Sequence, residues 1–335
     1  MPARQLSFFD DDDPAPAGSR ARPSAAPVLP AAADAEAVAL ARALPAAIRL
    51  GTSSWSFPGW TGLVYAPREG RPESEQRLAR AGLAAYAACP LFRTVSLDRT
   101  FYAPLSADAF AAYAAQVPDD FRFVVKAPAA FTDPVLRGGA AGDNPSFLDG
   151  AAAAAAFVRP AVEGLAGKVG ALVFQFPPLG RVARDPERLA ARIAAFVAVL
   201  PRGPRYAIEF RDPQCLLPGG VRILADAGAV PCLAVHARMP PVAEQVERLG
   251  GLSSGALVVR WNLHAGMAYD EAKQHYFPFD RLVDEDRESR AALADLAAAR
   301  AARGAEVLIT VNNKAEGSAP LSVRALARRI VGHDG

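Results

Sequence analysis

The alternation of two kinds of segment constrains this chain more than any other feature. Eight short runs of β-branched and aromatic residues are separated by longer stretches, rich in Ala, Leu and Arg, that have helical spacing. This pattern is typical of repeated βα units, which build a parallel sheet. The expected strands are Ile48–Ser53, Phe92–Leu97, Phe121–Lys126, Ala171–Phe176, Tyr206–Arg211, Cys232–His236, Ala256–Trp261 and Val307–Asn312. The expected helices are Glu73–Ala88, Ala107–Gln116, Ala151–Leu165, Pro186–Leu200, Gly219–Ala227, Arg287–Arg303 and Leu321–Ile330.

The number of units predicts the fold class, α/β. Eight βα units match a (β/α)₈ TIM-type barrel, which typically takes about 250 residues. An open, doubly wound sheet is the alternative, but it usually has fewer strands, and no Gly-x-Gly-x-x-Gly follows the first run. We therefore expect one barrel domain over residues 47–332.

Residues 1–46 have a different composition. An acidic run is followed by a mixture of Pro, Ala, Gly and Ser that buries too little apolar surface to fold alone. We expect a flexible, disordered tail here. Within it, Asp34–Leu44 predicts a short helix that Asp34 caps and Pro45 ends.

Charge and cysteine content limit the classes of partner and compartment. Lys plus Arg is 37 and Asp plus Glu is 35, so no overall basic field attracts nucleic acid. The three cysteines have no Cys-x-x-Cys spacing and predict neither a disulfide framework nor a zinc knuckle. Apolar stretches such as Ala151–Val158 are far shorter than the roughly 20 residues of a membrane span. We expect a cytoplasmic protein without membrane contact.

Polar residues stand at almost every expected strand end, where (β/α)₈ barrels carry their reactive groups. Candidate catalytic residues are Lys126, Glu209, Arg211 and Asn312. Candidate ligand-binding residues on these ends are Ser53, Asp98, Gln175, His236, Arg260, Asn262 and Asn313. Side chains alternate along a strand, so Glu209 shares a face with Arg211. If this face is inward, the barrel mouth favours an anionic ligand and Glu209 is the acid/base candidate. The alternative is a structural ion network that closes the barrel top.

Three loops extend this candidate site. Residues 312–320 follow the last strand and open the last helix, where phosphate-binding barrels hold their anion, and Lys314 adds positive charge there. Trp55 and Tyr102 follow the first two strands and are expected to stack on a ligand at the entrance. An ordinary capped loop and ordinary aromatic packing are the respective alternatives.

Metal-ligating residues are scarce at the expected mouth. A zinc or two-metal centre needs three or more converging His, Asp or Glu side chains. Only Asp98, Glu209 and His236 can be assembled from separate strands. We expect no cofactor, with a catalytic metal as the alternative.

Six motifs in sequence order resemble one known family, that of domain of unknown function 72, the YecE-like proteins. They are Gly51–Ser56, Thr100–Tyr102, Phe121–Lys126, Phe174–Pro178, Glu209–Arg211 and Asn312–Asn313. The resemblance covers residues 47–332 and implies a (β/α)₈ barrel without implying an activity. The chain departs from it at Ser96 and Asp98, where the family often has Glu and Asn, and at Asp133, where a His is common.

The tail contains a second resemblance. Residues 5–9 read Gln-Leu-Ser-Phe-Phe, similar to the short peptide by which bacterial replication and repair proteins dock on the sliding clamp. The expected contact residues are Gln5, Leu6, Phe8 and Phe9, since a terminal peptide with aromatic residues anchors in an apolar groove. Packing of the tail onto its own domain and a terminus without a partner are the alternatives.

Three functions fit these observations. The first is a nucleic-acid-processing, repair-associated phosphodiesterase that binds DNA or RNA, in which cations hold phosphate and Glu209 moves a proton. The second is a hydrolase, lyase or isomerase of a small sugar or phosphorylated metabolite, an anionic substrate for the same residues. The third is a ligand-binding module without turnover.

Overall fold

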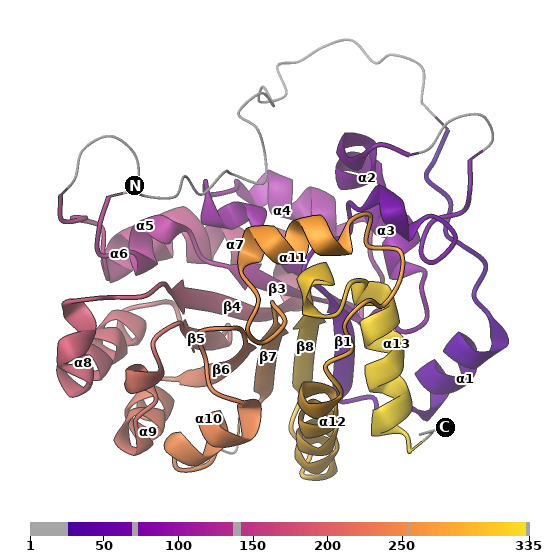
Figure 1. The fold of residues 1–335 in the computed structure, drawn as a ribbon. Coiled ribbons are helices and arrows are strands. Elements are labelled where there is room, and N and C mark those ends of the chain that lie inside the picture. The colour runs from indigo at the N-terminus through magenta and orange to yellow at the C-terminus, as the bar shows by residue number, and fades with distance from the viewer. Residues whose placement is uncertain (1–25, 69–72, 137–141, 253–254, 333–335) are drawn as a thin grey trace.

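The computed structural model describes residues 26–68, 73–136, 142–252 and 255–332. Eight parallel strands close into a barrel in sequence order (Figure 1). They are β1 (Ile48–Thr52), β2 (Thr94–Leu97), β3 (Arg122–Lys126), β4 (Val169–Phe176), β5 (Tyr206–Phe210), β6 (Ala229–Val235), β7 (Leu257–Trp261) and β8 (Val307–Val311). The predicted fold class is therefore confirmed, and every strand overlaps its expected run.

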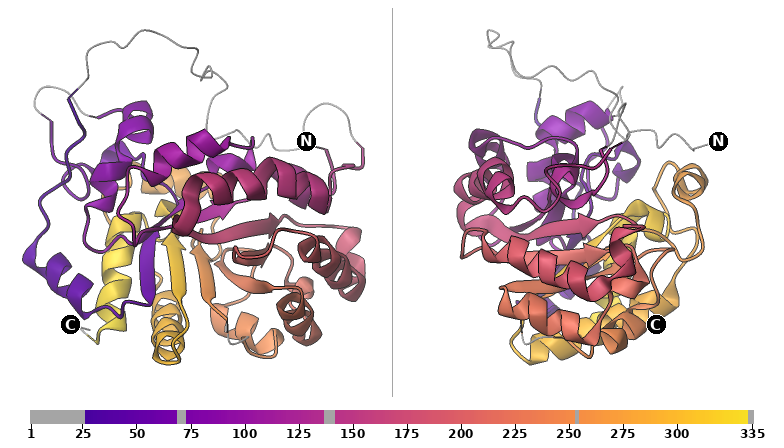
Figure 2. Two further views of the ribbon diagram at one scale, coloured as in Figure 1. Left: turned by 180° about the vertical axis from the view of Figure 1, so that it is seen from behind. Right: turned by 90° about the vertical axis from the view of Figure 1, so that its left-hand side faces the viewer.

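Helices surround this barrel (Figures 1 and 2). The α-helices are α1 (Ala35–Ala43), α2 (Glu75–Ala81), α3 (Leu83–Ala87), α4 (Ala107–Ala114), α5 (Ala129–Thr132), α6 (Gly150–Ala153), α7 (Arg159–Leu165), α8 (Pro186–Ala198), α9 (Pro218–Asp226), α10 (Val242–Arg248), α11 (Tyr269–Tyr276), α12 (Arg287–Ala302) and α13 (Ala319–Ile330). The 3₁₀ turns are η1 (Pro58–Trp60), η2 (Arg99–Phe101), η4 (Ala166–Lys168), η5 (Val182–Arg184), η6 (Pro213–Cys215) and η7 (Asn313–Ala315). The sequence analysis did not predict α5, α10 or α11, which are short. Within the described part of the chain, no helix is both long and apolar enough to cross a bilayer.

Local sequence signals explain where the helices begin and break. Asp185 caps α8, accepting a hydrogen bond from the Arg188 amide at 3.0 Å, and Pro186 occupies the first turn, where a missing N–H costs nothing. The stretch expected as one helix over Ala151–Leu165 contains a π-helical turn, η3 (Ala154–Val158). The interruption precedes Pro160, which has no amide hydrogen to continue the α-helical ladder.

The barrel interior shows which side chains face inward. Seven buried residues from six strands form a cluster separate from the main core between strands and helices. They are Val124, Ala171, Val173, Ala207, Cys232, Val258 and Leu308. Because side chains alternate along a strand, the residues two positions after members of this cluster also face inward, closer to the carboxyl end. This places Lys126, Gln175, Glu209 and Arg260 on the inner wall of the barrel mouth.

Part of the expected tail belongs to the folded body. The predicted helix forms as α1, and Asp34 caps it by accepting from the Ala37 amide at 2.7 Å. This helix lies beside α13 (Figures 1 and 2), where Arg324 contacts Asp34 at 2.6 Å and Leu40 is buried. The expected flexible tail thus does not extend to residue 46, because the apolar side of α1 packs against the barrel domain at α13. Residues 1–25, including Gln5, Leu6, Phe8 and Phe9, lie outside the described residues.

Candidate functional site

Arg260 lies at the centre of the barrel mouth. It is the last inward-facing residue of β7, and only 2% of its surface is exposed. Its Nη1 donates to Glu209 Oε2 at 2.9 Å, and its Nη2 donates to Asp98 Oδ2 at 2.5 Å. Glu209 Oε1 in turn forms an ion pair with Arg211. These four residues and Lys126 are called the mouth cluster below; it joins β2, β3, β5 and β7.

Glu209 is an ionised carboxylate within this cluster. Its complete burial would raise the pKa, but the adjacent guanidinium groups of Arg211 and Arg260 outweigh that effect and hold the pKa below its usual value. Both of its oxygens face a cation. Glu209 lies on the inner wall of the barrel, which is the orientation that the sequence analysis considered for an anion-binding mouth. The ion network that it considered as the alternative is also present, because Glu209 pairs with Arg211 and Arg260.

Lys126 differs from the arginines of the mouth cluster. Among the described residues, its amine has no ion-pair or hydrogen-bond partner, and Nζ lies 3.6 Å from the centre of the Phe101 ring. Burial lowers the pKa of Lys126 to about 7; the arginines reinforce this shift, whereas the charges of Asp98 and Glu209 oppose it. A large fraction of the Lys126 side chains is consequently neutral at neutral pH. The neutral form of an amine is both a base and a nucleophile.

Polar side chains flank the mouth cluster on neighbouring strands. Gln175 is half-buried on β4, and its amide makes no hydrogen bond within the part of the chain that is described. Asn262 donates to the Arg260 carbonyl oxygen at 3.0 Å. His236 accepts a hydrogen bond at Nδ1 from the Arg238 amide, and burial, together with the charge of Arg211, lowers its pKa to about 3. His236 is therefore a neutral neighbour of the cluster.

The loop after β8 contributes a second lysine to the rim. Lys314 Nζ lies 4.4 Å from the centre of the Tyr269 ring, and burial lowers the Lys314 pKa to about 8. Tyr269 begins α11, which lies above the carboxyl ends of β7 and β8 (Figure 1). Sequence reasoning missed Tyr269, although an aromatic residue in the loop after the seventh strand was a usable signal.

The two asparagines of this loop have different surroundings. Asn312 is half-buried, and its side chain accepts from the Lys314 amide at 3.0 Å. Asn313 is 1% exposed, and its Oδ1 accepts from the Trp60 indole at 3.1 Å and from the Ala319 amide at 2.8 Å. Asn313 thus fixes the loop to the start of α13, because both donors to its oxygen come from the protein.

Two of the expected binding residues near β1 are buried. Trp55 is 5% exposed, its indole donates to the Leu78 carbonyl at 3.0 Å, and Tyr113 packs against its edge. Trp55 is corrected accordingly from an entrance residue to a core residue, since α2 covers it. Ser53 is 4% exposed. Tyr102, by contrast, follows η2 and is 59% exposed, so it is accessible to a ligand.

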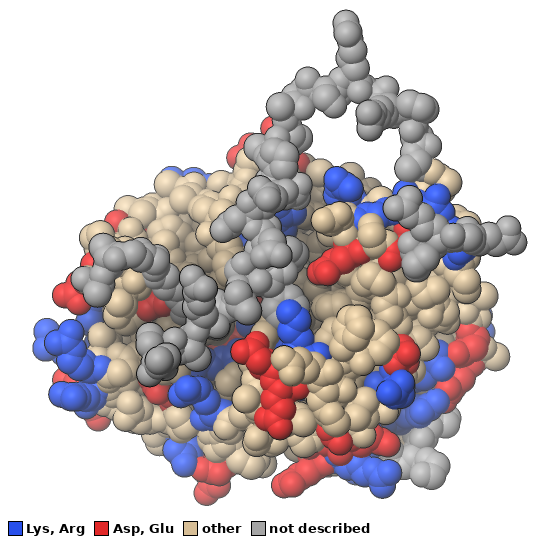
Figure 3. Space-filling model, turned by 45° about the horizontal axis from the view of Figure 1, so that its top comes forward, with Lys and Arg blue, Asp and Glu red and all other residues tan. Residues whose placement is uncertain are grey.

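One face of the molecule carries mixed charge. Outside the grey residues, basic and acidic side chains are interspersed on the face shown in Figure 3. Across the described ranges, no group of three or more His, Cys, Asp or Glu side chains is arranged to hold a metal ion. Asp98 and Glu209, two of the three candidate ligands, instead share Arg260.

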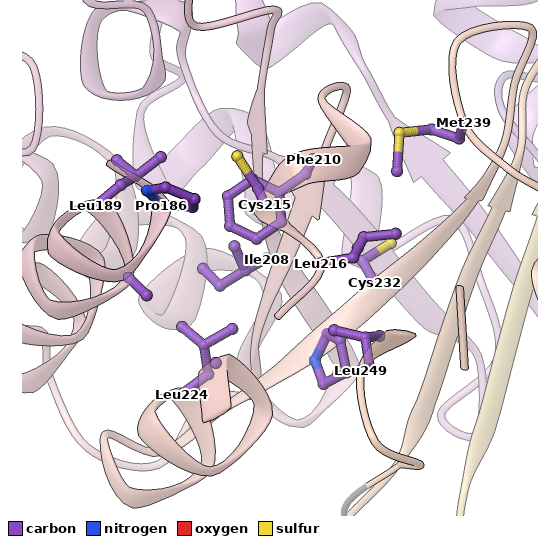
Figure 4. Close-up of a pocket in the computed structure, with 13 residues that line it drawn as sticks. Pro186, Leu189, Ile208, Phe210, Cys215, Leu216, Leu224, Cys232, Met239 and Leu249 are labelled. Atoms are coloured by element: carbon purple, nitrogen blue, oxygen red, sulfur yellow. The ribbon is translucent and has the colours of Figure 1, made fainter. Parts of the chain in front are cut away.

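A small apolar pocket lies beside β5 and β6 (Figure 4). It is formed between β5, β6 and the helices α8 and α9, with Leu189, Leu224 and Met239 among its lining. Burial, with the charge of Asp212, raises the pKa of its Cys215 thiol to about 12, so this thiol stays protonated. The pocket has no reactive group and is not the candidate site.

Fold and site together define a (β/α)₈-barrel protein with a charged cluster at the mouth, where enzymes of this fold carry their active sites. The family model described as "Protein of unknown function DUF72" matches residues 49–334. The chain therefore belongs to the DUF72 family.

Solved structures of the family share the fold. A DUF72 family protein from Enterococcus faecalis V583 is 17% identical, with a TM-score of 0.59 over 86% of this chain and 96% of that chain. A DUF72 family protein from Thermotoga maritima MSB8 is 20% identical, with a TM-score of 0.54 over 85% of this chain and 99% of that chain. No curated protein matches the chain. At these identities the likeness is one of fold alone.

Proposed function

We propose that the mouth cluster is the active site of a lyase or isomerase that acts on a small anionic metabolite, such as a sugar phosphate or a sugar acid. The observation that carries this proposal is Lys126, a half-buried amine on the inner wall without an ionic partner among the described residues. A lysine with a pKa near 7 transfers protons efficiently at neutral pH. Lyases and isomerases of carbonyl compounds depend on such a transfer.

The balance of charge supports a small anion over a nucleic-acid strand. Within the mouth cluster two arginines face two carboxylates, so their formal charges cancel, and the protonated fraction of Lys126 supplies the remaining positive charge. Lys314 adds a second cation at the rim. This excess suits one carboxylate or phosphate group, whereas a strand requires a row of unpaired cations along its backbone.

The other members of the cluster have supporting roles in this proposal. Glu209 and Arg211 position Arg260, because Glu209 is fully buried and bound to both guanidinium groups. Asp98 is the carboxylate that a substrate can reach, since 35% of its side chain is exposed. The Ser96 hydroxyl, which donates to Asp98 at 2.6 Å, holds it in place.

Proton exchange in D₂O tests the proposal. The protein is incubated with sugar phosphates and sugar acids, and loss of carbon-bound proton signals is followed by NMR. We expect catalysed exchange for at least one compound, and a ~100-fold or larger loss of rate in Lys126→Met. Lys273→Met, which removes an exposed lysine of α11, is the matched control and keeps the rate. Undiminished exchange in Lys126→Met contradicts the proposal, and binding without exchange in the wild type indicates a ligand-binding module.

Nucleic-acid processing is the second candidate function. The exposed Tyr102 near the mouth and the clamp-like peptide Gln5–Phe9 favour it. Calorimetric titration of the full chain against the sliding clamp, with a Gln5→Ala, Phe9→Ala double variant as control, tests the partner. Micromolar binding that the double variant loses places the protein at replicating or repaired DNA. Absence of binding removes the clamp-like peptide as support for nucleic-acid processing and favours the metabolite proposal.

A further inference from the structure

We infer that Lys126 acts as a nucleophile that forms a covalent imine with an aldehyde or ketone substrate carrying an anionic group. The inference rests on the proposed function, because it names the substrate class and the chemical step of the same site. It assigns to Lys126 a bond to the substrate in addition to the movement of a proton.

The surroundings of Lys126 meet the requirements of an imine-forming lysine. Such a lysine must be neutral, which proteins achieve by removing the amine from water or by placing other cations beside it. Both conditions are present. Burial on the inner wall removes the amine from water, and Arg211 and Arg260 lie close enough to disfavour a further positive charge, whereas the face of the Phe101 ring, 3.6 Å from Nζ, favours the charged form. No hydrogen bond or ion pair to the described residues occupies the amine, so its lone pair is available.

The remaining lysines of the chain have other environments. The sequence contains four lysines, Lys126, Lys168, Lys273 and Lys314. Lys168 donates to the carbonyl oxygens of Ala114 and Val117, at 2.9 and 2.8 Å, at the opposite end of the barrel. Lys273 is exposed on α11, and Lys314 lies against Tyr269. Lys126 is the lysine whose position on the inner wall faces the mouth.

The step balances without a further reagent. The neutral amine of Lys126 attacks the carbonyl carbon, and a proton passes from nitrogen to the new hydroxyl oxygen to give a carbinolamine. The nitrogen lone pair then expels that oxygen as water, with one proton taken from solvent, and leaves a protonated imine. The cationic nitrogen withdraws electrons from the neighbouring carbon, which eases removal of a proton or cleavage of a carbon–carbon bond there.

Reductive trapping tests this inference on the full-length protein. Dihydroxyacetone phosphate and pyruvate serve as anionic probes, dihydroxyacetone as the neutral one, and sodium borohydride reduces the imine to a stable secondary amine. Trypsin does not cleave at a modified lysine, so the adduct is found by mass spectrometry in the peptide of residues 123–137. We expect at least ~10-fold more adduct there than at Lys273, and more with an anionic probe than with the neutral one. Trapping should rise with pH through about 7.

The variants separate this inference from the proposed function. Lys126→Arg keeps the positive charge but cannot form an imine, so it should lose trapping while its melting curve shows a folded protein. Equal adducts at Lys126 and Lys273, or none with any probe, overturn the imine. If trapping fails while D₂O exchange still depends on Lys126, the imine is wrong and the proposed function stands. If neither depends on Lys126, both fail.

Discussion

The two ends of the barrel use the same charged residue types for different purposes. At the amino-terminal end, Glu306 accepts a hydrogen bond from Arg49 at 2.7 Å and forms an ion pair with Arg205 at 2.9 Å. The cations there also bind backbone carbonyls, as when Arg205 donates to Gly170 at 2.7 Å and Lys168 bridges two helix-end carbonyls. At the mouth, the arginines bind carboxylates, and Lys126 has no such partner within the described residues.

The comparison shows how a barrel separates stability from reactivity. Charges at the amino-terminal end hold strands and loops together and are partly solvated. The ion pairs at the mouth are almost completely buried, a costly arrangement that is common where charge serves a ligand. Changes of charge at the mouth should therefore have larger effects on stability than a change at the amino-terminal end, and within the mouth the sign should depend on whether the side chain has an ionic partner.

The largest effect is expected from Glu209→Gln. This change leaves Arg211 and Arg260 buried without the carboxylate between them, so the free energy of unfolding should fall by ~3–5 kcal/mol. Urea unfolding at neutral pH measures the loss. A loss below about 1 kcal/mol would mean that water solvates this pair as it does surface pairs, and the contrast between the ends would disappear.

A change of opposite sign is expected from Lys126→Met. The folded protein lowers the pKa of Lys126 from 10.5 to about 7, so burying its charged form costs stability below pH 7. The variant should be more stable than the wild type at pH 6, by ~1 kcal/mol. The unfolded chain binds the extra proton between about pH 7 and 10.5, so the wild type should recover stability over that range. Paired unfolding curves at pH 6, 8 and 10 test the trend, and a constant difference would contradict the depressed pKa.

The smallest effect is expected from Glu306→Gln at the amino-terminal end. Arg49 and Arg205 keep their backbone carbonyl partners, on Asp120 and Gly170, after the carboxylate is neutralised. The free energy of unfolding should fall by ~0.5 kcal/mol, measured in urea beside Glu209→Gln. A loss as large as that of Glu209→Gln would show that both ends depend on buried charge.

Short-range patterns were enough to place the elements and many of the charged candidates. Strand runs every few dozen residues predicted the barrel, and alternation placed Glu209 and Arg211 on one face. The π-helical turn before Pro160 and the burial of Trp55 were not predicted. Each depends on a detail that periodicity does not contain: the absence of one amide hydrogen in Pro160, and the packing of α2 over the Trp55 indole.

The sequence alone determined the fold class and the end of the barrel on which polar residues gather. The alternation of strands and the spacing of helices each involve only a few consecutive residues, so they can be recognised from a short stretch of sequence. Only the tertiary structure decided which charges meet. Arg260 and Asp98 are 162 residues apart in sequence and come together because barrel closure brings β2 and β7 to one mouth. The same closure pairs Glu209 with two arginines and places the Lys126 amine beside them on the inner wall. Electrostatic interactions depend on the distance between charges in space, which their separation along the chain does not determine.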